Sequence, residues 1–358
     1  MSNSKRIAFL LSSLRFGGGE RVVLNLAAAL KAQGYDVDIL LMSEEGEFLK
    51  GAHELFNVVN LDCNRTWKLP FKLWKYVQKS QPTAIISSFW KLNICACITK
   101  ALFSRIKLVV WEHSPPSKSK NSPTFLYAIS SSVFYQFATK IVAVSNGVAS
   151  DVKRITFGLD RKVITILNPI PPPDKVESKR PSRMGKKILW VGRLDSPKNP
   201  ELMLVAFAGL PASKGYTLDF VGDGILRDML EQRVHRLGLE RVVRFHGFQS
   251  NPYEWMMNSD LLVLSSDREG LPTVLIEALH AGLRPIATDC GQGVHDILGD
   301  NLYGTIVPPN DKHALKRAIE LELNTPFNAE LQLNGAQRFS PRIIALEFLH
   351  ALGLEEFH

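Results

Sequence analysis

The sequence has 358 residues, of which 45% are hydrophobic and 22% charged, and its formal net charge is +8. This length suggests two domains, and the ordinary composition excludes a chain too polar to bury a core in each of them. The positive charge favours anionic partners, namely phosphates, nucleic acid or an acidic membrane surface, without choosing among them.

Short runs of β-branched and aliphatic residues alternate with helical patterns through the first half of the chain. These runs lack the polar–apolar alternation of a half-exposed strand, so both faces of each strand should be covered, as in a parallel sheet between helices. The predicted strands are Arg6–Leu11, Val37–Met42, Ala84–Ser88, Leu108–Trp111, Ile141–Ser145 and Val163–Leu167.

Three consecutive glycines, Gly17, Gly18 and Gly19, separate the first predicted strand from a helix expected from about Glu20 to Ala32. Glycines at this point let the backbone approach a ligand closely, and the start of a helix favours an anion. The segment is neither a GxGxxG dinucleotide fingerprint nor a P-loop. A simple tight turn is therefore the alternative interpretation.

The segment from Trp67 to Lys79 combines lysines with large aromatic residues. A helix would gather its lysines on one side, and basic residues beside Trp and Phe suit an anionic headgroup interface. Contact with a membrane is one hypothesis, and a core-facing surface helix with solvated lysines is the other. The basic segment Lys100–Lys107 could extend the same surface. The lysines are Lys68, Lys72, Lys75 and Lys79, and the apolar residues are Trp67, Phe71, Leu73, Trp74 and Val77.

One histidine, His113, lies just beyond the predicted strand Leu108–Trp111. A histidine at a strand end that faces a cleft is a candidate site residue, because its protonation can change near neutral pH. A lone histidine is more often structural, so the assignment of His113 to a functional site needs further support.

Clustered prolines in Asn168–Pro173 mark a break in the chain, because they cannot continue a helix or a central strand. We predict a first domain over residues 1–168, a linker over 169–186 and a second domain over 187–340. A final helix within 341–358 would pack back toward the first domain. The predicted strands of the second domain are Lys187–Val191, Thr217–Val221, Val242–His246, Leu261–Ser265, Arg284–Thr288 and Thr305–Val307.

Two glycine-containing loops follow the first strands of the second domain. In the loop that begins at Gly192, Arg193 and Lys198 are placed to converge on one anionic group, since Arg grips phosphate oxygens in a fork and Lys acts as a compact charge. Gly222 and Gly224 follow the next strand and would permit close approach of a ligand. Solvated basic residues and an ordinary turn are the alternatives.

The most specific segment of the chain is Glu269–Glu277, which follows the predicted strand Leu261–Ser265. Pro272 suits the first turn of a helix, so the backbone N–H groups from Gly270 to Thr273 could hold a diphosphate. Glu269 could then accept hydrogen bonds from a sugar, and Glu277, ~7.5 Å along the helix, from two ribose hydroxyls. The alternative is two glutamates that pair with the helix dipole.

Together these motifs, with Glu112-His113 and Asn168-Pro169, resemble the family-4 retaining glycosyltransferases. The resemblance covers nearly the whole chain. It implies an α/β protein with the GT-B fold, which consists of two facing Rossmann-like, doubly wound parallel-sheet domains. The second domain would bind the nucleotide sugar, and the first would lie on the acceptor side.

The resemblance also implies a role for each residue. Arg193 and Lys198 would bind the donor pyrophosphate and stabilise it as the leaving group, Glu269 would bind the transferred sugar and Glu277 the ribose. His113 would contact the donor sugar near the reacting carbon and help to orient the acceptor. The other donor-binding positions would be the loop Gly17, Gly18 and Gly19, then Gly222, Phe248 beside the base, and the helix start Gly270, Leu271, Pro272 and Thr273.

The family transfers a sugar with retention of configuration. No carboxylate is placed convincingly as a covalent nucleophile, so we expect a front-face displacement in which the leaving phosphate helps to deprotonate the acceptor. Because Arg193 and Lys198 would neutralise that phosphate, we expect no metal and no further cofactor beyond the nucleotide sugar.

Within the family, the segment around Glu269–Glu277 and Thr288–Gly293 is similar to bacterial enzymes that extend lipid-linked oligosaccharides for lipopolysaccharide or protein N-glycans. This similarity implies a UDP-N-acetylhexosamine donor such as UDP-GalNAc and a polyprenyl-pyrophosphate-linked saccharide acceptor. Transfer of another hexose from UDP-glucose, UDP-galactose or GDP-mannose is an alternative.

Three rival interpretations are a nucleotide-sugar epimerase, a non-catalytic nucleotide-sugar binder and a nucleic-acid-binding protein. The combination of Arg193, Lys198 and Glu269 fits transfer better than epimerisation, and intact Glu269 and His113 argue against a binder. No recognised nucleic-acid motif occurs, so no nucleic-acid partner is expected.

The sequence shows no signal peptide and no apolar run near the ~20 residues needed to span a bilayer. The four cysteines form no CxxC pair and no cluster at metal-ligand spacing, which indicates core residues in a reducing compartment. We therefore expect a cytoplasmic protein that could dock on the cytoplasmic face of the inner membrane. The cysteines are Cys63, Cys95, Cys97 and Cys290.

Overall fold

A computed structural model describes residues 5–15, 17–118, 124–173, 186–326 and 329–354 of the chain. It divides into two compact units, one of residues 1–171 with 339–358 and one of residues 172–338. Residues 174–185, most of the predicted linker, lie outside the described residues, as do 355–358 at the end of the predicted final helix.

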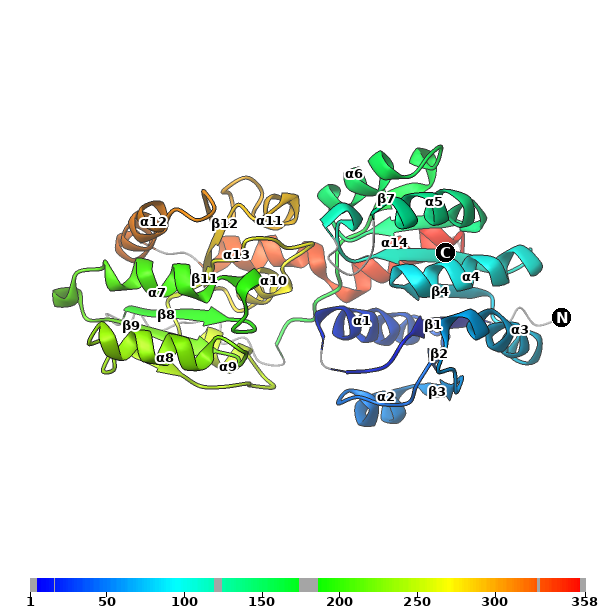
Figure 1. The fold of residues 1–358 in the computed structure, drawn as a ribbon, viewed down its shortest axis with the longest axis horizontal. Helices are drawn as coiled ribbons and strands as arrows, with labels where there is room; N and C mark the ends of the chain where they lie inside the picture. Colours follow the sequence, from blue (N-terminus) through cyan, green and yellow to red (C-terminus); the bar gives the residue numbers. More distant parts are fainter. Residues whose placement is uncertain (1–4, 16, 119–123, 174–185, 327–328, 355–358) are drawn as a thin grey trace. The chain divides into compact units, whose positions relative to one another are not determined.

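The first unit is built on a parallel sheet with strand order β3-β2-β1-β4-β5-β6-β7 (Figure 1). The prediction of a doubly wound parallel sheet is confirmed, and the predicted strands agree with the structure to within two residues at each end. The short edge strand β3 was not predicted. The strands are β1 Arg6–Leu11, β2 Asp36–Leu41, β3 Asn57–Asn60, β4 Ala84–Ser88, β5 Lys107–Glu112, β6 Lys140–Ala143 and β7 Val163–Thr165.

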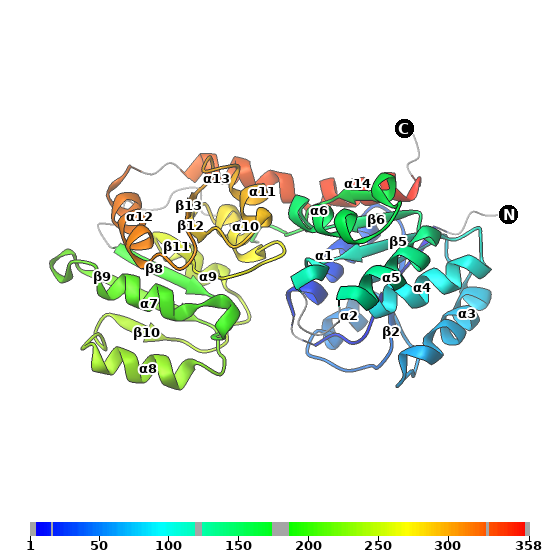
Figure 2. The same cartoon turned by 45° about the horizontal axis from the view of Figure 1, so that its top comes forward.

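The helices of the first unit cover the buried strands. Helices α3, α4 and α5 lie side by side, and α14 packs against α1 (Figure 2). The apolar strands that they cover are buried on both faces, as in Ile7 to Leu11 of β1, which are all fully buried. The helices are α1 Gly18–Ala32, α2 Leu49–Leu55, α3 Leu69–Ser80, α4 Trp90–Leu102, α5 Thr124–Phe134, α6 Asn146–Ile155 and α14 Pro341–Leu352.

Helix α14 is far from the rest of the first unit in sequence but contributes to its core. The ring of Phe348 packs edge-on against the buried ring of Trp111, with 4.8 Å between their centroids. The backbone N–H of Ile170 donates to the carbonyl of Phe339, just before α14, at 3.0 Å. The Tyr35 hydroxyl donates to the carbonyl of Leu354, just after it.

The second unit is also built on a parallel sheet, with strand order β10-β9-β8-β11-β12-β13. Its core includes Trp190, Phe220 and Met203, and helices flank its strands (Figure 1). The strands are β8 Lys186–Val191, β9 Tyr216–Val221, β10 Val243–Phe245, β11 Leu261–Leu264, β12 Arg284–Thr288 and β13 Thr305–Val307. The helices are α7 Pro200–Ala208, α8 Arg227–Arg236, α9 Tyr253–Met257, α10 Thr273–His280, α11 Gln292–Leu298, α12 Lys312–Asn324 and α13 Ala329–Ala336.

Two further features concern membrane spans and cysteine chemistry. None of the helices in the described ranges combines the length and hydrophobicity that a membrane span requires. The four cysteines, Cys63, Cys95, Cys97 and Cys290, are buried and unpaired, and burial raises the pKa of the Cys95 thiol to about 11. They are core residues rather than reactive thiols.

Candidate functional site

Each sheet has a point where the strand order reverses. In the second unit the chain passes from β8 outward to β9 and β10, then returns to place β11 on the other side of β8. The loops that leave the carboxyl ends of two such strands diverge to opposite faces of the sheet and leave a crevice where ligands bind. In this unit the two loops are those that begin at Gly192 and at Ser265.

These two loops bring a predicted cation and a predicted carboxylate into contact. The Nζ atom of Lys198 lies 2.5 Å from Oε1 of Glu269, and the Ser266 hydroxyl donates to the same oxygen at 2.9 Å. Both side chains of the ion pair are largely but not fully buried. The Arg193 side chain is exposed and pairs with Asp195 at 3.2 Å. The loops therefore present Arg193, Lys198 and Glu269 at the carboxyl ends of β8 and β11.

A residue that we did not predict as a site residue, Asn199, ties these loops together. Its backbone is left-handed, with φ 47°, and its side-chain oxygen accepts from the N–H of Leu202 at the start of α7. Its amide nitrogen donates to Asp267 at 2.8 Å and to Asn310 at 2.9 Å. An Asn before Pro at a helix start indicates a cap, but nothing local in the sequence indicates the two longer contacts.

The predicted donor-binding residue Gly222 has no room for a side chain. A Cβ atom there would lie 1.8 Å from the carbonyl oxygen of Gly192, and its φ is 134°. Its N–H donates to the carbonyl of Gly247 at 2.8 Å, which links the ends of β9 and β10. Phe248 follows Gly247 with an exposed ring. Close backbone packing thus brings the loops after β8, β9 and β10 together.

The predicted helix start lies where α10 begins, and Pro272 precedes its first residue, Thr273. The first N–H groups of a helix have no partner within it, so they can bind an anion. Glu277, the fifth residue of α10, is buried. The other two residues of the predicted set, Gly270 and Leu271, form the turn before the helix, and Leu271 is buried.

In the first unit the strand order reverses between β1 and β4. Of the predicted Gly17, Gly18 and Gly19, the first ends the loop after β1 and the other two are the first residues of α1. This segment contacts the residue that follows β4. A Cβ atom on Gly19 would lie 3.2 Å from the ring of Phe89, and one on Gly17 would collide with the carboxylate of Glu20. Burial raises the pKa of that carboxylate. Because these glycines lack side chains, the start of α1 can pack against the ring of Phe89, and the carboxylate of Glu20 can lie beside Gly17.

Phe89 is a second residue that the sequence did not indicate. Its φ of 73° is unfavourable for a residue with a large side chain, and such strain persists where the surroundings enforce it. Its ring stacks on His113, with 5.4 Å between the centroids. Phe89 therefore connects the glycine loop to the histidine, and no sequence pattern reveals a positive φ at a phenylalanine.

His113 lies at the end of β5, between the rings of Phe89 and Trp111, the latter at 4.7 Å. Burial lowers the pKa of His113 to about 4, so its imidazole is neutral at pH 7. Its Nε2 atom is buried and has no hydrogen-bond partner among the described residues. A neutral imidazole in this state can donate or accept a hydrogen bond to a ligand but does not supply a positive charge.

The neighbouring Glu112 is buried and hydrogen-bonded rather than exposed to a ligand. It accepts from the Tyr135 hydroxyl at 2.5 Å and from the Asn93 amide at 3.2 Å. Burial raises the pKa of Glu112 to about 7, although these hydrogen bonds oppose the change. Glu112 therefore supports the end of β5, next to His113.

The described residues contain no group of three or more His, Cys, Asp or Glu side chains arranged to hold a metal ion. One Asp-x-Asp pair, Asp36 and Asp38, does occur, but it lies at the amino end of β2. Asp38 is buried there and accepts from the Tyr76 hydroxyl at 2.6 Å and from Asn57 at 2.9 Å. Asp38 is therefore part of the core while Asp36 is exposed, and the expectation of a metal-free site stays a prediction.

Residues 16–172 match the family described as Glycosyltransferase Family 4, and residues 173–338 match the family described as Glycosyl transferases group 1. The border between the two matches falls between the two compact units.

Two similar proteins come from Campylobacter jejuni. A GalNAc-alpha-(1->4)-GalNAc-alpha-(1->3)-diNAcBac-PP-undecaprenol alpha-1,4-N-acetyl-D-galactosaminyltransferase is 30% identical over 345 residues, which are 93% of each chain. An N-acetylgalactosamine-N,N'-diacetylbacillosaminyl-diphospho-undecaprenol 4-alpha-N-acetylgalactosaminyltransferase is 27% identical over 89% of this chain and 90% of its own.

Solved structures share the fold. The Anabaena protein HepE in complex with UDP has a TM-score of 0.83 at 20% identity, over 97% of this chain and 99% of its own. The apo form of the lipopolysaccharide outer core galactosyltransferase WaaB has a TM-score of 0.78 at 19% identity, over the same shares of the two chains. Both likenesses extend over the two units of the chain.

Proposed function

The chain belongs to glycosyltransferase family 4, has the GT-B fold and is a hexosyltransferase. We propose that it transfers an N-acetylhexosamine, with GalNAc as the first candidate, from a UDP-sugar to a saccharide linked to polyprenyl pyrophosphate. Transfer proceeds with retention of configuration. The proposed sugar and acceptor follow the names of the two Campylobacter relatives.

The observation that carries the proposal is the meeting of Lys198 and Glu269 at the carboxyl ends of β8 and β11, with Arg193 on the same loop as Lys198. This is the place in a doubly wound sheet where a ligand binds. A donor diphosphate would attract the two cations, and the release of Lys198 would leave Glu269 able to accept from sugar hydroxyls. The start of α10 adds N–H groups, and Glu277 follows along the helix.

In the proposed mechanism the enzyme acts by charge stabilisation and positioning. Arg193 and Lys198 bind the diphosphate and stabilise the charge that grows on it as the bond to the sugar breaks. The leaving phosphate oxygen then takes the proton of the acceptor hydroxyl that attacks from the same face. His113, neutral and with an available Nε2 atom, orients the sugar or the acceptor hydroxyl.

The acceptor that we propose carries a polyprenyl chain, so the enzyme would meet it at a bilayer surface. Helix α3 and the turn before it offer one contact, since Trp67 and Phe71 are exposed and the ammonium groups of Lys68 and Lys75 lie over their rings. Leu73 and Val77, which we expected on the same surface, are instead buried against the core. The proposed contact is therefore aromatic and basic only.

Release of UDP tests the function directly. The protein would be incubated with UDP-GalNAc and a polyprenyl-pyrophosphate saccharide, and UDP and the extended lipid would both be measured. We expect UDP and product in equal amounts, and a thermal-shift panel of nucleotide sugars should favour the same donor. An epimerised sugar without UDP would indicate an epimerase, and tight binding without turnover would indicate a binder.

A further inference from the structure

Helix α5 presents an apolar face to solvent. Phe125, Ile129 and Val133 recur at four-residue intervals and are exposed, as is Leu126, while Tyr127 on the opposite side is buried. Phe125 is 70% exposed. A surface helix of a globular protein ordinarily exposes its polar side chains, whereas α5 exposes apolar ones. Patches of this kind mark sites of interaction.

The two partly buried serines of α5, Ser130 and Ser132, use their hydroxyls within the protein. The helix contains no charged residue, and the hydroxyls of Ser130 and Ser132 donate to backbone carbonyls one turn earlier, at 2.6 and 2.7 Å. Ser132 Oγ also accepts from the backbone N–H of Phe157, whose side chain is 77% exposed. We call Phe125, Leu126, Ile129, Val133 and Phe157 the α5 face. Because Ser130 and Ser132, the serines nearest to this face, already have partners, the face can leave water without leaving their hydroxyls unpaired.

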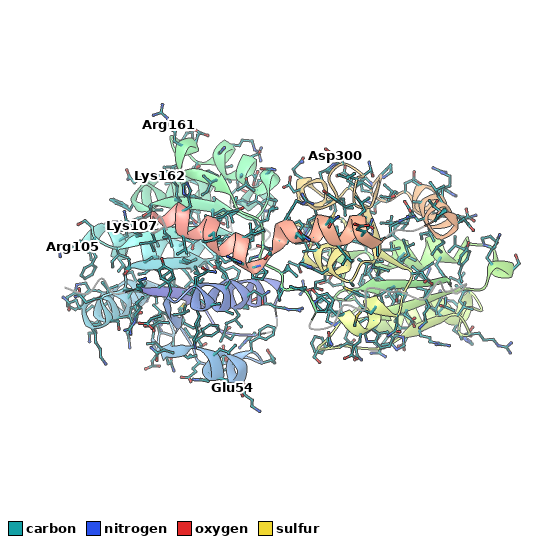
Figure 3. All side chains as sticks on the ribbon, turned by 180° about the vertical axis from the view of Figure 1, so that it is seen from behind. Glu54, Arg105, Lys107, Arg161, Lys162 and Asp300 are labelled. Carbon is teal, nitrogen blue, oxygen red and sulfur yellow. The ribbon has the colours of Figure 1, made fainter. Side chains whose placement is uncertain are left out.

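Basic residues border the α5 face at the carboxyl-terminal end of the helix. The Nζ atom of Lys162 donates to the carbonyls of Ala138, at 2.9 Å, and Gln136, both just after α5. Burial, and then the charges of Lys107 and Lys162, lower the pKa of Lys100, so these lysines are close to one another. Figure 3 shows Lys107 and Lys162 along one side of the first unit, with Arg105 and Arg161.

This part of the chain is also nearly free of negative charge. The sequence has no acidic residue between Asp62 and Glu112, or between Glu112 and Asp151, and Glu112 is buried. Helices α3, α4 and α5, which lie side by side, all fall within these stretches (Figure 2). The layer that they form therefore offers lysines and apolar side chains without competing carboxylates of its own.

We propose that the α5 face docks on an anionic lipid bilayer. Its apolar side chains enter the boundary between headgroups and acyl chains, and the basic residues beyond α5 meet the anionic headgroups. A second copy of the chain would bring the same positive charge against itself, and nucleic acid would gain nothing from exposed Ile129 and Val133. The proposal rests on the proposed function, because a lipid-linked acceptor is presented at such a surface.

Vesicle flotation of the full chain tests the proposal. Vesicles would contain phosphatidylcholine with or without phosphatidylglycerol. The triple variant Phe125→Ser/Ile129→Ser/Val133→Ser should lose at least about tenfold in vesicle affinity, because exposed apolar area drives the insertion. A matched variant of the second unit, Leu237→Ser/Leu302→Ser/Leu321→Ser, also loses three exposed leucines and should bind as the wild type does.

A second triple variant tests the basic residues beside the α5 face. It is Arg105→Glu/Lys107→Glu/Arg161→Glu, and all three replaced side chains are exposed. It should lose binding to phosphatidylglycerol vesicles at low salt, and thermal unfolding would show that each variant is folded. Wild-type affinity in the serine triple variant would overturn the proposal. So would a wild-type dimer that the serine substitutions convert to monomer, since the face would then be a subunit interface.

Activity on two acceptors separates this proposal from the proposed function. With a polyprenyl acceptor in vesicles, the serine triple variant should transfer at least about tenfold more slowly than the wild type, whereas a short-chain, water-soluble acceptor should be extended equally by both. If the wild type extends neither acceptor, the proposed function is wrong while vesicle binding still decides the role of the α5 face. If the wild type extends both but does not bind vesicles, the docking proposal alone is wrong.

Discussion

The ammonium group of Lys198 lies 2.5 Å from the carboxylate of Glu269, so the loops after β8 and β11 are joined by an ion pair at the point where the strand order reverses. In the protein without a ligand, this carboxylate balances the lysine charge. A diphosphate would compete for the same ammonium group. The residue proposed to bind the sugar and the residue proposed to bind the diphosphate are thus coupled through a direct contact.

Substitution of the two proposed diphosphate ligands should affect turnover strongly. Loss of one charge-assisted partner costs ~2–4 kcal/mol of transition-state stabilisation, so Arg193→Ala and Lys198→Ala should each lower turnover at least a hundredfold. UDP release would be measured, with circular dichroism to show that the fold is intact. Lys214→Ala, which changes an exposed lysine of the same unit, is the control. Near-normal turnover in either site variant would remove that residue from the proposed site.

Activity should not depend on a divalent metal. If Arg193 and Lys198 neutralise the leaving diphosphate, a metal ion has no further charge to balance there. The rate of UDP release in EDTA should therefore match the rate without it. Complete loss in EDTA, restored by magnesium or manganese, would show that the diphosphate is bound in a different way.

Glu112 and His113 should compensate each other in their effect on stability. Burial raises the pKa of Glu112 from 4.5 to about 7 and lowers that of His113 from 6.5 to about 4. Between pH 4.5 and 6.5, the unfolded chain carries an ionised Glu112 and a protonated His113, whereas the folded chain carries both in their neutral forms. Both states therefore bind equal numbers of protons, and the pair should leave the free energy of unfolding unchanged across this window.

Single substitutions of Glu112 and His113 should reveal the pH dependence that each residue gives to the free energy of unfolding and that cancels in the wild type. The stability that Glu112 contributes is present below pH 4.5 and lost as pH rises to about 7, so Glu112→Gln should gain about 3 kcal/mol relative to the wild type over that range. The contribution of His113 is present above pH 6.5 and lost as pH falls to about 4, so His113→Phe should gain a similar amount in the other direction. Urea unfolding across pH would measure both. Parallel curves for variants and wild type would contradict the burial of these groups.

Gly222 should not tolerate a side chain. In Gly222→Ala the new Cβ would meet the carbonyl oxygen of Gly192, and a φ of 134° is unfavourable for alanine, so we expect a loss of roughly 3 kcal/mol or more. Gly215→Ala is the matched control, since φ there is also positive, at 67°, but the space is open. Denaturant unfolding of both variants would separate the cost of the collision from the cost of placing alanine at a positive φ. Equal losses would show that the loop after β9 moves to accept a methyl group.

Helix α3 should contribute to vesicle binding through its charge. Reversing Lys68, Lys72, Lys75 and Lys79 to Glu should abolish co-sedimentation with anionic vesicles, because each near-surface charge adds ~1 kcal/mol. Wild-type binding should weaken at high salt for the same reason. If the wild type does not bind, or if the variant binds equally well, the lysines of α3 have no role in docking.

The sequence predicts the central strands well because they are apolar on both faces. Arg6–Leu11, Ala84–Ser88 and Arg284–Thr288 end where predicted. The edge strand Asn57–Asn60 was missed, since it has only two valines between asparagines, and asparagine is unfavourable in strands. Its backbone pairing with β2 places it in the sheet, and such pairing leaves little trace in so short a segment.

The parts of the candidate site that were missed depend on contacts between distant segments. Motif spacing indicates Lys198 and Glu269 but not that they pair with each other. The ring of Phe89 reaches both Gly19 and His113 only because the backbone at position 89 has a positive φ, which no neighbour in sequence demands. The contacts of Asn199 with Asp267 and Asn310 likewise join segments that are far apart in the chain.

The return of α14 to the first unit has a consequence for synthesis of the protein. Phe348 fills the core beside Trp111, yet the ribosome makes it more than two hundred residues later. At ~5–20 residues per second, the β5 strand must wait ~12–50 s for this partner. During that time the surface of Trp111 and its neighbours is open to chaperones, and the second unit can finish folding before the first.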